Sequence, residues 1–304
     1  MSDNAIAMIL TSFAADSLAL GPHWIYDTSQ IDQKFGRVEN LKKPLENSFH
    51  PTKNKGEFTH YGDQTLLLLK SIADGISFDM NRYADAWLDF FNTYTGYKDH
   101  ATKLTLANMA DGKDPQTCGS DSSDLGGASR IPPLVYFYRN HSEKLIDAVK
   151  QQTALTHNTP NVIKSAVFFA TVAMEVLNGT EPVRSIQKLA DTEFSKDPIR
   201  SWIDRGLSSR SEDTRNAILK FGQMCDVKSA FPSVIHLIAK YEKNPREALI
   251  ENVMSGGDSA ARGLLVGMVL GAHTGLESIP QEWITGMKAI HQIRQYLEAI
   301  DGKS

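Results

Sequence analysis

The chain has 304 residues, with 32 Lys and Arg against 36 Asp and Glu, which gives a formal net charge of −4. Hydrophobic residues at 41% and charged residues at 22% are near globular averages, which excludes a disordered or fibrous chain. The slight acidity argues against a nucleic-acid-binding protein, which usually carries a concentrated basic face. The basic clusters Lys42-Lys43 and Lys53-Asn54-Lys55 are interpreted as solvated loops.

Cysteine usage and the missing leader pattern bear on location. Cys118 and Cys225 are too few for a disulfide framework or a structural zinc site and favour a reducing compartment. The apolar stretch at 5–20 lacks the basic region that opens a signal peptide. No apolar run approaches the ~18 residues of a membrane span. We therefore expect a cytoplasmic protein that partners neither membranes nor nucleic acid.

Helical periodicity recurs along the chain, whereas strand alternation is almost absent. The first helix is expected over 5–20, where Ile9, Phe13 and Asp16 share one face, and another is expected to start at the capping residue Asn81. Further helices are predicted at 63–74, 101–109, 133–139, 143–153, 162–177, 183–190, 213–221, 232–241, 245–253, 259–273 and 288–300. Proline in a first turn is favourable, and Pro232 is assigned such a position. The pattern predicts an all-α fold of about a dozen or more helices.

Two longer irregular stretches, 37–61 and 111–130, interrupt the helices. Neither has the composition of a linker, so we expect one domain over residues 1–304. Long ordered loops in a compact helical domain are usually functional.

Three segments place polar residues beside apolar helices. They are 21–27 (GPHWIYD), 61–65 (YGDQT) and 255–263 (SGGDSAARG). Asp63 and Asp258 both stand where a helix is predicted to begin. Spacing alone favours a structural role for each as an N-cap, because a carboxylate accepts the free N–H groups there.

These segments, together with 130–133 (RIPP) and 155–157 (LTH), also carry a family resemblance. In matching order and over nearly the whole chain, they resemble the ADP-ribosylglycohydrolase family. The match is closer to a divergent branch that includes lens crystallins and selenoproteins. The resemblance implies a compact all-α orthogonal bundle with a central cleft. Family members usually cleave the glycosidic bond that joins ADP-ribose to a protein side chain or small acceptor, using two divalent cations.

The metal ligands that the resemblance implies are only partly present. One ligand set of the family falls on Gly62, Asp63 and Gln64, and the other falls on Asp258, Ala260 and Ala261. Asp63 and Asp258 remain carboxylates, and Gln64 is a neutral oxygen donor. Because magnesium needs hard oxygen ligands and charge compensation, we expect one Mg²⁺ site at most, formed by Asp63, Gln64 and Asp258, or a metal-free site.

Two further departures concern charge. His23 stands where the resemblance implies a glutamate, so an imidazole replaces a carboxylate. Arg262 follows Asp258 by four residues and so shares its helix face. Two roles stay open for Arg262: a positive charge in place of a metal, or a structural ion pair with Asp258.

The remaining candidates each have two interpretations. Trp24 and Tyr26 either stack on a ligand or belong to the core. His157 either lines the cleft or caps a helix, and Arg130 either holds a diphosphate or is an ordinary surface residue. Asp16, on an apolar helix face, is expected to support the loop around His23 because a buried carboxylate needs hydrogen bonds.

Two functions follow from the resemblance. The first is a hydrolase of a glycosidic bond to a ribose, in an ADP-ribose-like or nucleotide-like small molecule or an ADP-ribosylated substrate, with Asp63 or Asp258 as general base. The second is a non-catalytic binding or structural protein, crystallin-like, that retains fold and cleft. In either case we expect Asp63 and Asp258 within about 8 Å of each other, with His23 in the same cleft. The sequence does not indicate an oligomeric state.

Overall fold

The computed structural model describes residues 3–75 and 77–302. Helices account for 66% of it, about twice the globular average. Within these ranges there is no strand, and β-type pairing is limited to the isolated bridges Ser120–His157 and Asp124–Asp226. The all-α prediction is confirmed.

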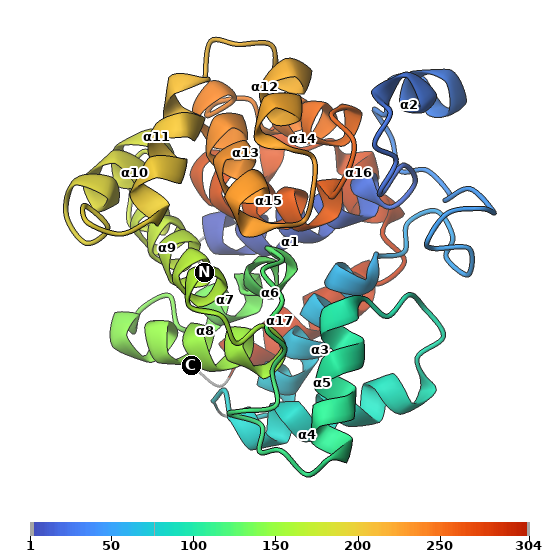
Figure 1. Cartoon of the computed structure of the whole chain (residues 1–304), viewed down its shortest axis with the longest axis vertical. Coiled ribbons are helices and arrows are strands. Elements are labelled where there is room, and N and C mark those ends of the chain that lie inside the picture. Colours follow the sequence, from blue (N-terminus) through green and yellow to red (C-terminus); the bar gives the residue numbers. More distant parts are fainter. Residues whose placement is uncertain (1–2, 76, 303–304) are drawn as a thin grey trace.

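Two long apolar helices, α1 (Asp3–Ala19) and α15 (Ser259–Thr274), form the centre of the molecule (Figure 1). Nearly all of their residues are buried. A Cβ atom at Gly267 would lie 2.7 Å from the Thr11 carbonyl oxygen, and one at Gly271 would lie 2.8 Å from that of Ala7. The glycines therefore let the two backbones touch, as their four-residue spacing indicates.

The other helices surround this pair (Figure 1). On one side lie α10 (Pro182–Asp191), α11 (Ile199–Ser208), α12 (Thr214–Phe221), α13 (Val227–Lys240) and α14 (Pro245–Met254). On the other side lie α3 (His60–Asp74), α4 (Met80–Thr93), α5 (His100–Ala110) and α17 (Ile290–Asp301). Between them are α6 (Gly126–Ser129), α7 (Pro132–Phe137), α8 (Ser142–Thr156) and α9 (Pro160–Leu177). The short elements are α2 (Thr28–Phe35), α16 (Gln281–Gly286) and a 3₁₀ turn at Leu276–Ser278.

Several helix starts differ from the prediction because other residues cap them. The N-cap of α4 is Asp79 rather than Asn81, and its carboxylate accepts from the Arg82 N–H at 2.7 Å. Asp226 caps α13, so Pro232 lies inside that helix rather than in its first turn. Helix α2 was not expected because it is short and polar, although Asp27 at its start and Gly36 at its end are ordinary capping signals.

Helix α9 is long and apolar enough to cross a membrane by length and composition alone. In the structure 56% of that window is buried inside the protein. Phe168 and Phe169 of α9 pack against Phe231 of α13 at ring-centroid distances of 5.2 and 4.7 Å. These contacts are those of a core helix.

Candidate functional site

The loop after α1 and the loop before α15 are tied together by backbone hydrogen bonds. The Trp24 N–H donates to the Gly257 carbonyl at 3.0 Å, and the Gly257 N–H donates to the Ile25 carbonyl at 2.9 Å. Gly256 and Gly257 have φ angles of 69° and 66°, a conformation that glycine adopts at little cost. Two segments more than 200 residues apart in the sequence therefore form one site.

Asp258 is held by His23. The Asp258 carboxylate stands at the N-cap position of α15 but makes no capping hydrogen bond. Its Oδ1 lies 3.0 Å from Nε2 of His23, whose Nδ1 lies 2.8 Å from Nε2 of His50. All three side chains are buried, with residue exposures of 0%, 2% and 1% for Asp258, His23 and His50. Asp258 thus stands at the N-cap position, as the structural interpretation predicts, and its carboxylate also contacts a buried chain of two imidazoles.

Burial sets the protonation of this chain. It raises the pKa of Asp258 to about 6, against the opposing positive charge of Arg262, and it lowers the pKa of His23. Burial also lowers the pKa of His50, with smaller contributions from the neighbouring histidines. At neutral pH the carboxylate is therefore ionised and both imidazoles are neutral. Within the described ranges Asp258 Oδ2 and His50 Nδ1 have no hydrogen-bond partner.

Asp63 has different partners. It lies in the first turn of α3, which begins at His60 and is capped by Thr59, so Asp63 is not the N-cap. Its Oδ2 accepts from Lys53 Nζ at 2.6 Å and from the Tyr94 hydroxyl at 2.5 Å. Burial raises the pKa of Asp63, and the Lys53 charge opposes that shift. Lys53 is therefore not a solvated loop residue: its side chain is 14% exposed and neutralises Asp63.

Asp63 and His23, the partner of Asp258, line two different pockets. His23, Trp24 and Tyr26 line a pocket of about 420 Å³ beside α2, whereas Asp63 lines one of about 320 Å³ with Lys53 and Tyr94. The two pockets share no lining residue. That Asp63, Asp258 and His23 meet in one cleft stays a prediction. Two residues of the irregular stretch 37–61 contact these side chains: His50 is hydrogen-bonded to His23, and Lys53 to Asp63.

Gln64 and Arg130 belong to an internal hydrogen-bond network. Gln64 Oε1 accepts from Trp87 Nε1 at 2.9 Å and also from Arg130. Arg130 is 1% exposed and donates further to the Gly126 carbonyl and to the Thr156 hydroxyl. Arg130 is thus neither a surface residue nor a diphosphate clamp, because its donors are used inside the protein.

His157 adjoins this network and is 1% exposed. Its Nδ1 lies 2.9 Å from Thr156 Oγ1, and its Nε2 has no partner within the described part of the chain. Burial, with the nearby Arg130 charge, lowers the pKa of His157 to about 3. The cap of α8 comes from the backbone N–H of His157, which donates to the Thr153 carbonyl, and not from its ring.

Arg262 does not pair directly with Asp258. Its guanidinium donates to Asn252 Oδ1 at 3.0 Å and to the Gly256 carbonyl at 2.6 Å. Within the described ranges the side chain that contacts Asp258 is the neutral His23, through a hydrogen bond of 3.0 Å. The prediction that Arg262 contacts Asp258 is therefore wrong. Arg262 stabilises the turn before Asp258 by hydrogen bonds, and its positive charge lowers the pKa of Asp258 without direct contact.

Trp24 and Tyr26 both reach a pocket surface. Tyr26 is 40% exposed, and Trp24 is partly buried with its ring stacked on His23 at 4.4 Å between centroids. Among the described residues, Trp24 is the non-glycine residue with a positive φ, at 64°. Such strain persists where the surrounding structure imposes it, often at functional sites.

Asp16 supports α3 rather than the loop around His23. Its two carboxylate oxygens accept from the backbone N–H and hydroxyl of Thr59, at 2.8 and 2.6 Å. A Cβ at Gly62 would lie 2.4 Å from Asp16 Oδ2. A side chain at position 62 therefore cannot fit beside this carboxylate without displacing it.

The family model described as ADP-ribosylglycohydrolase matches residues 1–303. The chain belongs to the ADP-ribosylglycohydrolase family. Crystallin J1A of Tripedalia cystophora is 26% identical over 98% of this chain and 96% of its own length. Crystallin J1B of the same organism is 24% identical over 99% of this chain and 97% of its own length. A solved structure titled ADP-ribosylglycohydrolase-related protein complex superposes with a TM-score of 0.75 at 20% identity, covering 100% of this chain and 98% of that one, and so shares the fold.

The residues of this ADP-ribosylglycohydrolase family member do not fit a two-cation cluster. One side-chain oxygen each of Asp63, Gln64 and Asp258 is engaged by Lys53, Arg130 and His23 respectively. Within the described ranges, no group of three or more His, Cys, Asp or Glu side chains is arranged to hold a metal. The tentative ligand set Asp63, Gln64 and Asp258 is likewise dispersed over separate contacts.

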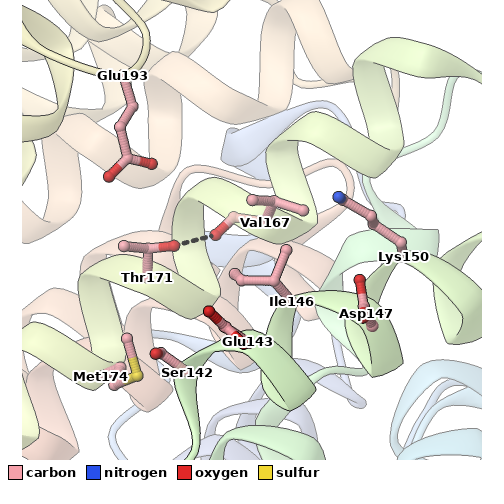
Figure 2. Close-up of a pocket in the computed structure, with 9 residues that line it drawn as sticks. All are labelled: Ser142, Glu143, Ile146, Asp147, Lys150, Val167, Thr171, Met174 and Glu193. Atoms are coloured by element: carbon pink, nitrogen blue, oxygen red, sulfur yellow. Dashed lines mark hydrogen bonds between the residues drawn. The ribbon is translucent and has the colours of Figure 1, made fainter.

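A larger pocket, of about 630 Å³, lies elsewhere on this ADP-ribosylglycohydrolase family member. Figure 2 shows it between α8 and α9, with Glu143, Asp147 and Lys150 from α8 and Glu193 opposite. None of the residues predicted for the functional site lines it. Pocket size alone therefore does not identify the family site.

Sequence reasoning missed the partners of the two aspartates: His50, Lys53 and Tyr94. His50 and Lys53 lie in the irregular stretch 37–61, whose length was the one available signal. No local pattern connects either residue with an aspartate, because hydrogen bonds of this kind form only after the chain folds.

Proposed function

We propose that the chain is a hydrolase of the ADP-ribosylglycohydrolase type, acting on a glycosidic bond to a ribose in an ADP-ribose-like or nucleotide-like substrate without a two-metal cluster. The observation that carries the proposal is the Asp258 carboxylate. One of its oxygens is fixed by His23, and the other is buried without a partner in the described structure.

Asp258 is the general base in this proposal. Its Oδ2 takes a proton from water while the water oxygen attacks the anomeric carbon of the ribose. The bond to the acceptor breaks, and its electron pair leaves with the acceptor. A carboxylate whose pKa is raised to about 6 is still ionised at neutral pH and is a stronger base than an ordinary aspartate.

The other site residues bind or position. His23 uses both ring nitrogens within the protein, so it orients Asp258 rather than meeting the substrate. Trp24 and Tyr26 supply aromatic walls to the adjoining pocket. Asp63 is neutralised by Lys53 and is the weaker candidate base.

Release of ADP-ribose from ADP-ribosyl-arginine and ADP-ribosyl-serine peptides, followed by mass spectrometry, tests the proposal. We expect turnover that persists in EDTA and falls at least 100-fold in Asp258→Asn, the scale of general-base catalysis. Asp191→Asn, at an exposed aspartate of α10, is the matched control. Equal activity of Asp258→Asn and the unmodified chain, or activity only with added magnesium, contradicts it.

The crystallin relatives favour a second candidate, a non-catalytic binding or structural protein that keeps the cleft. The internal neutralisation of Asp63 is consistent with that role. Thermal unfolding with ADP-ribose separates the two, because a ligand that binds only the folded state raises its stability. Stabilisation without turnover of either peptide supports the second candidate.

A further inference from the structure

His50 has one ring nitrogen without a partner. The residue is 1% exposed, and its Nδ1 makes no hydrogen bond within the described ranges. The Trp24 ring is a neighbour of the His50 ring, with 6.0 Å between their centroids. Its indole Nε1 is also buried and has no partner within the described ranges. A buried polar atom without a partner costs about 1–3 kcal/mol, so two in neighbouring rings call for a functional explanation.

The hydrogen-bond chain determines what the free nitrogen of His50 offers. An ionised Asp258 carboxylate only accepts, so His23 carries its proton on Nε2, and its Nδ1 is an acceptor. The His50 Nε2 must then carry the proton that it shares with His23 Nδ1. A neutral His50 therefore presents a lone pair on Nδ1, and Trp24 presents an N–H donor.

An acceptor beside a donor suits a hydroxyl group, which can donate to one and accept from the other. Two further aromatic rings lie against Trp24. Phe49 and Tyr97 contact it edge-on, with ring centroids 4.9 and 5.0 Å from the Trp24 centroid. Phe49 is 49% exposed and lines the same pocket as His23 and Trp24. This exposed ring thus lies against Trp24 at the pocket and can turn away when a ligand enters.

We propose that His50 is a ligand-binding residue of this site, whose Nδ1 accepts a hydrogen bond from a hydroxyl of a ribose-containing ligand. Trp24 Nε1 donates to the same ligand, and Phe49 moves aside to admit it. This inference rests on the proposed function, because it requires that the ligand binds in the pocket lined by His23. It assigns the role to a loop residue that is not among the residues carried by the family resemblance.

The test is ¹⁵N NMR of the full chain with ¹⁵N-labelled histidine side chains, titrated with ADP-ribose. In the free protein we expect His50 Nδ1 to resonate as a lone-pair nitrogen. On binding, the signal should shift in the direction of a hydrogen-bonded acceptor, while exposed His291 stays unchanged. The signals are assigned by comparison with His50→Gln and His291→Gln.

Affinity provides the second measurement. His50→Phe should bind ADP-ribose about tenfold more weakly, whereas His50→Gln, which keeps a donor and an acceptor, should recover most of the affinity. His291→Phe is the control and should bind as the unmodified chain does. Binding of ADP-ribose with an unmoved His50 Nδ1 signal and an unaffected His50→Phe variant overturns this inference and leaves the proposed function standing. No binding by the unmodified chain overturns both.

Discussion

At the scale of single residues, environment separates two aspartates that look alike in the sequence. Asp63 meets an ammonium group and a phenol, whereas Asp258 meets an imidazole that is itself hydrogen-bonded. Lys53 forms a direct ion pair with Asp63 at 2.6 Å. A neutral His23 only orients a carboxylate, which leaves Asp258 as the more available base.

The Lys53–Asp63 pair makes a testable contribution to stability. Lys53→Met removes the cation and leaves a mostly buried carboxylate with only the Tyr94 hydroxyl. We expect the free energy of unfolding to fall by about 2–3 kcal/mol, below the loss for a fully buried pair because both side chains are 14% exposed. Urea denaturation measures the change, with exposed Lys55→Met as the control. The double variant Lys53→Met/Asp63→Asn should recover part of the loss, and an unaffected single variant contradicts the prediction.

At the scale of elements, the site depends on how closely α1 and α15 pack. His23 follows α1 and Asp258 precedes α15, so any separation of these helices moves one side chain of the pair relative to the other. Small residues along α15 permit the contact, since Gly267 and Gly271 lie against backbone atoms of α1. Helix packing therefore positions the His23–Asp258 hydrogen bond.

Gly267→Ala tests this close approach. The added Cβ would lie 2.7 Å from the Thr11 carbonyl oxygen, a backbone atom that cannot rotate away. We expect a loss of about 2–3 kcal/mol in the free energy of unfolding, typical of overpacking a core. Gly302→Ala, where the nearest atom lies 3.4 Å from the added Cβ, should change stability little. Equal stability of the two variants would show that the helix pair tolerates separation.

At the scale of the whole molecule, buried neutral histidines govern the response to acid. Burial lowers the pKa of His157 to about 3 and that of His236 to about 4, and it also lowers those of His23 and His50. The unfolded chain binds protons at these residues below about pH 6.5, whereas the native state does not. Each such histidine therefore costs the native state about 1.4 kcal/mol per pH unit as the pH falls below 6.5.

Asp16 and Asp258 act in the opposite direction. Burial raises both pKa values to about 6, so between pH 6 and 4 the native state binds these protons first and gains stability. Burial also raises the pKa values of Asp63 and Asp124, which adds to this effect. The four histidines start to cost stability at about pH 6.5, before Asp16 and Asp258 bind protons, so we expect the free energy of unfolding to decrease from pH 7 to pH 5. Urea denaturation at pH 7, 6 and 5 checks the sign. Constant or rising stability over this range would contradict it.

Metal dependence is also a property of the assembled molecule. With Asp63, Gln64 and Asp258 engaged by other side chains, we expect calorimetric titration with Mg²⁺ or Mn²⁺ to give one weak site at most. The midpoint of thermal unfolding should be the same in EDTA and in magnesium. Two tight sites per chain would restore the two-metal mechanism of the family.

The sequence by itself determined the all-α class and the family, and it drew attention to Asp63 and Asp258. These features follow from local patterns: helical periodicity, capping residues and five short motifs in order. It also indicated that the metal ligands are incomplete, because Gly62, Ala260 and Ala261 have no ligand atoms.

Only the tertiary structure decided which side chains meet. Arg262 was expected on Asp258 from a four-residue spacing, yet its planar fork of donors is better satisfied by Asn252 and the Gly256 carbonyl. For Arg130 the sequence left two roles open, diphosphate binding or an ordinary surface position, yet the structure buries it against Gln64 and Thr156. His50 and Lys53 reach the site from a loop without periodicity, and the hydrogen bonds of such residues depend on the path of the backbone through space, which no spacing along the chain encodes.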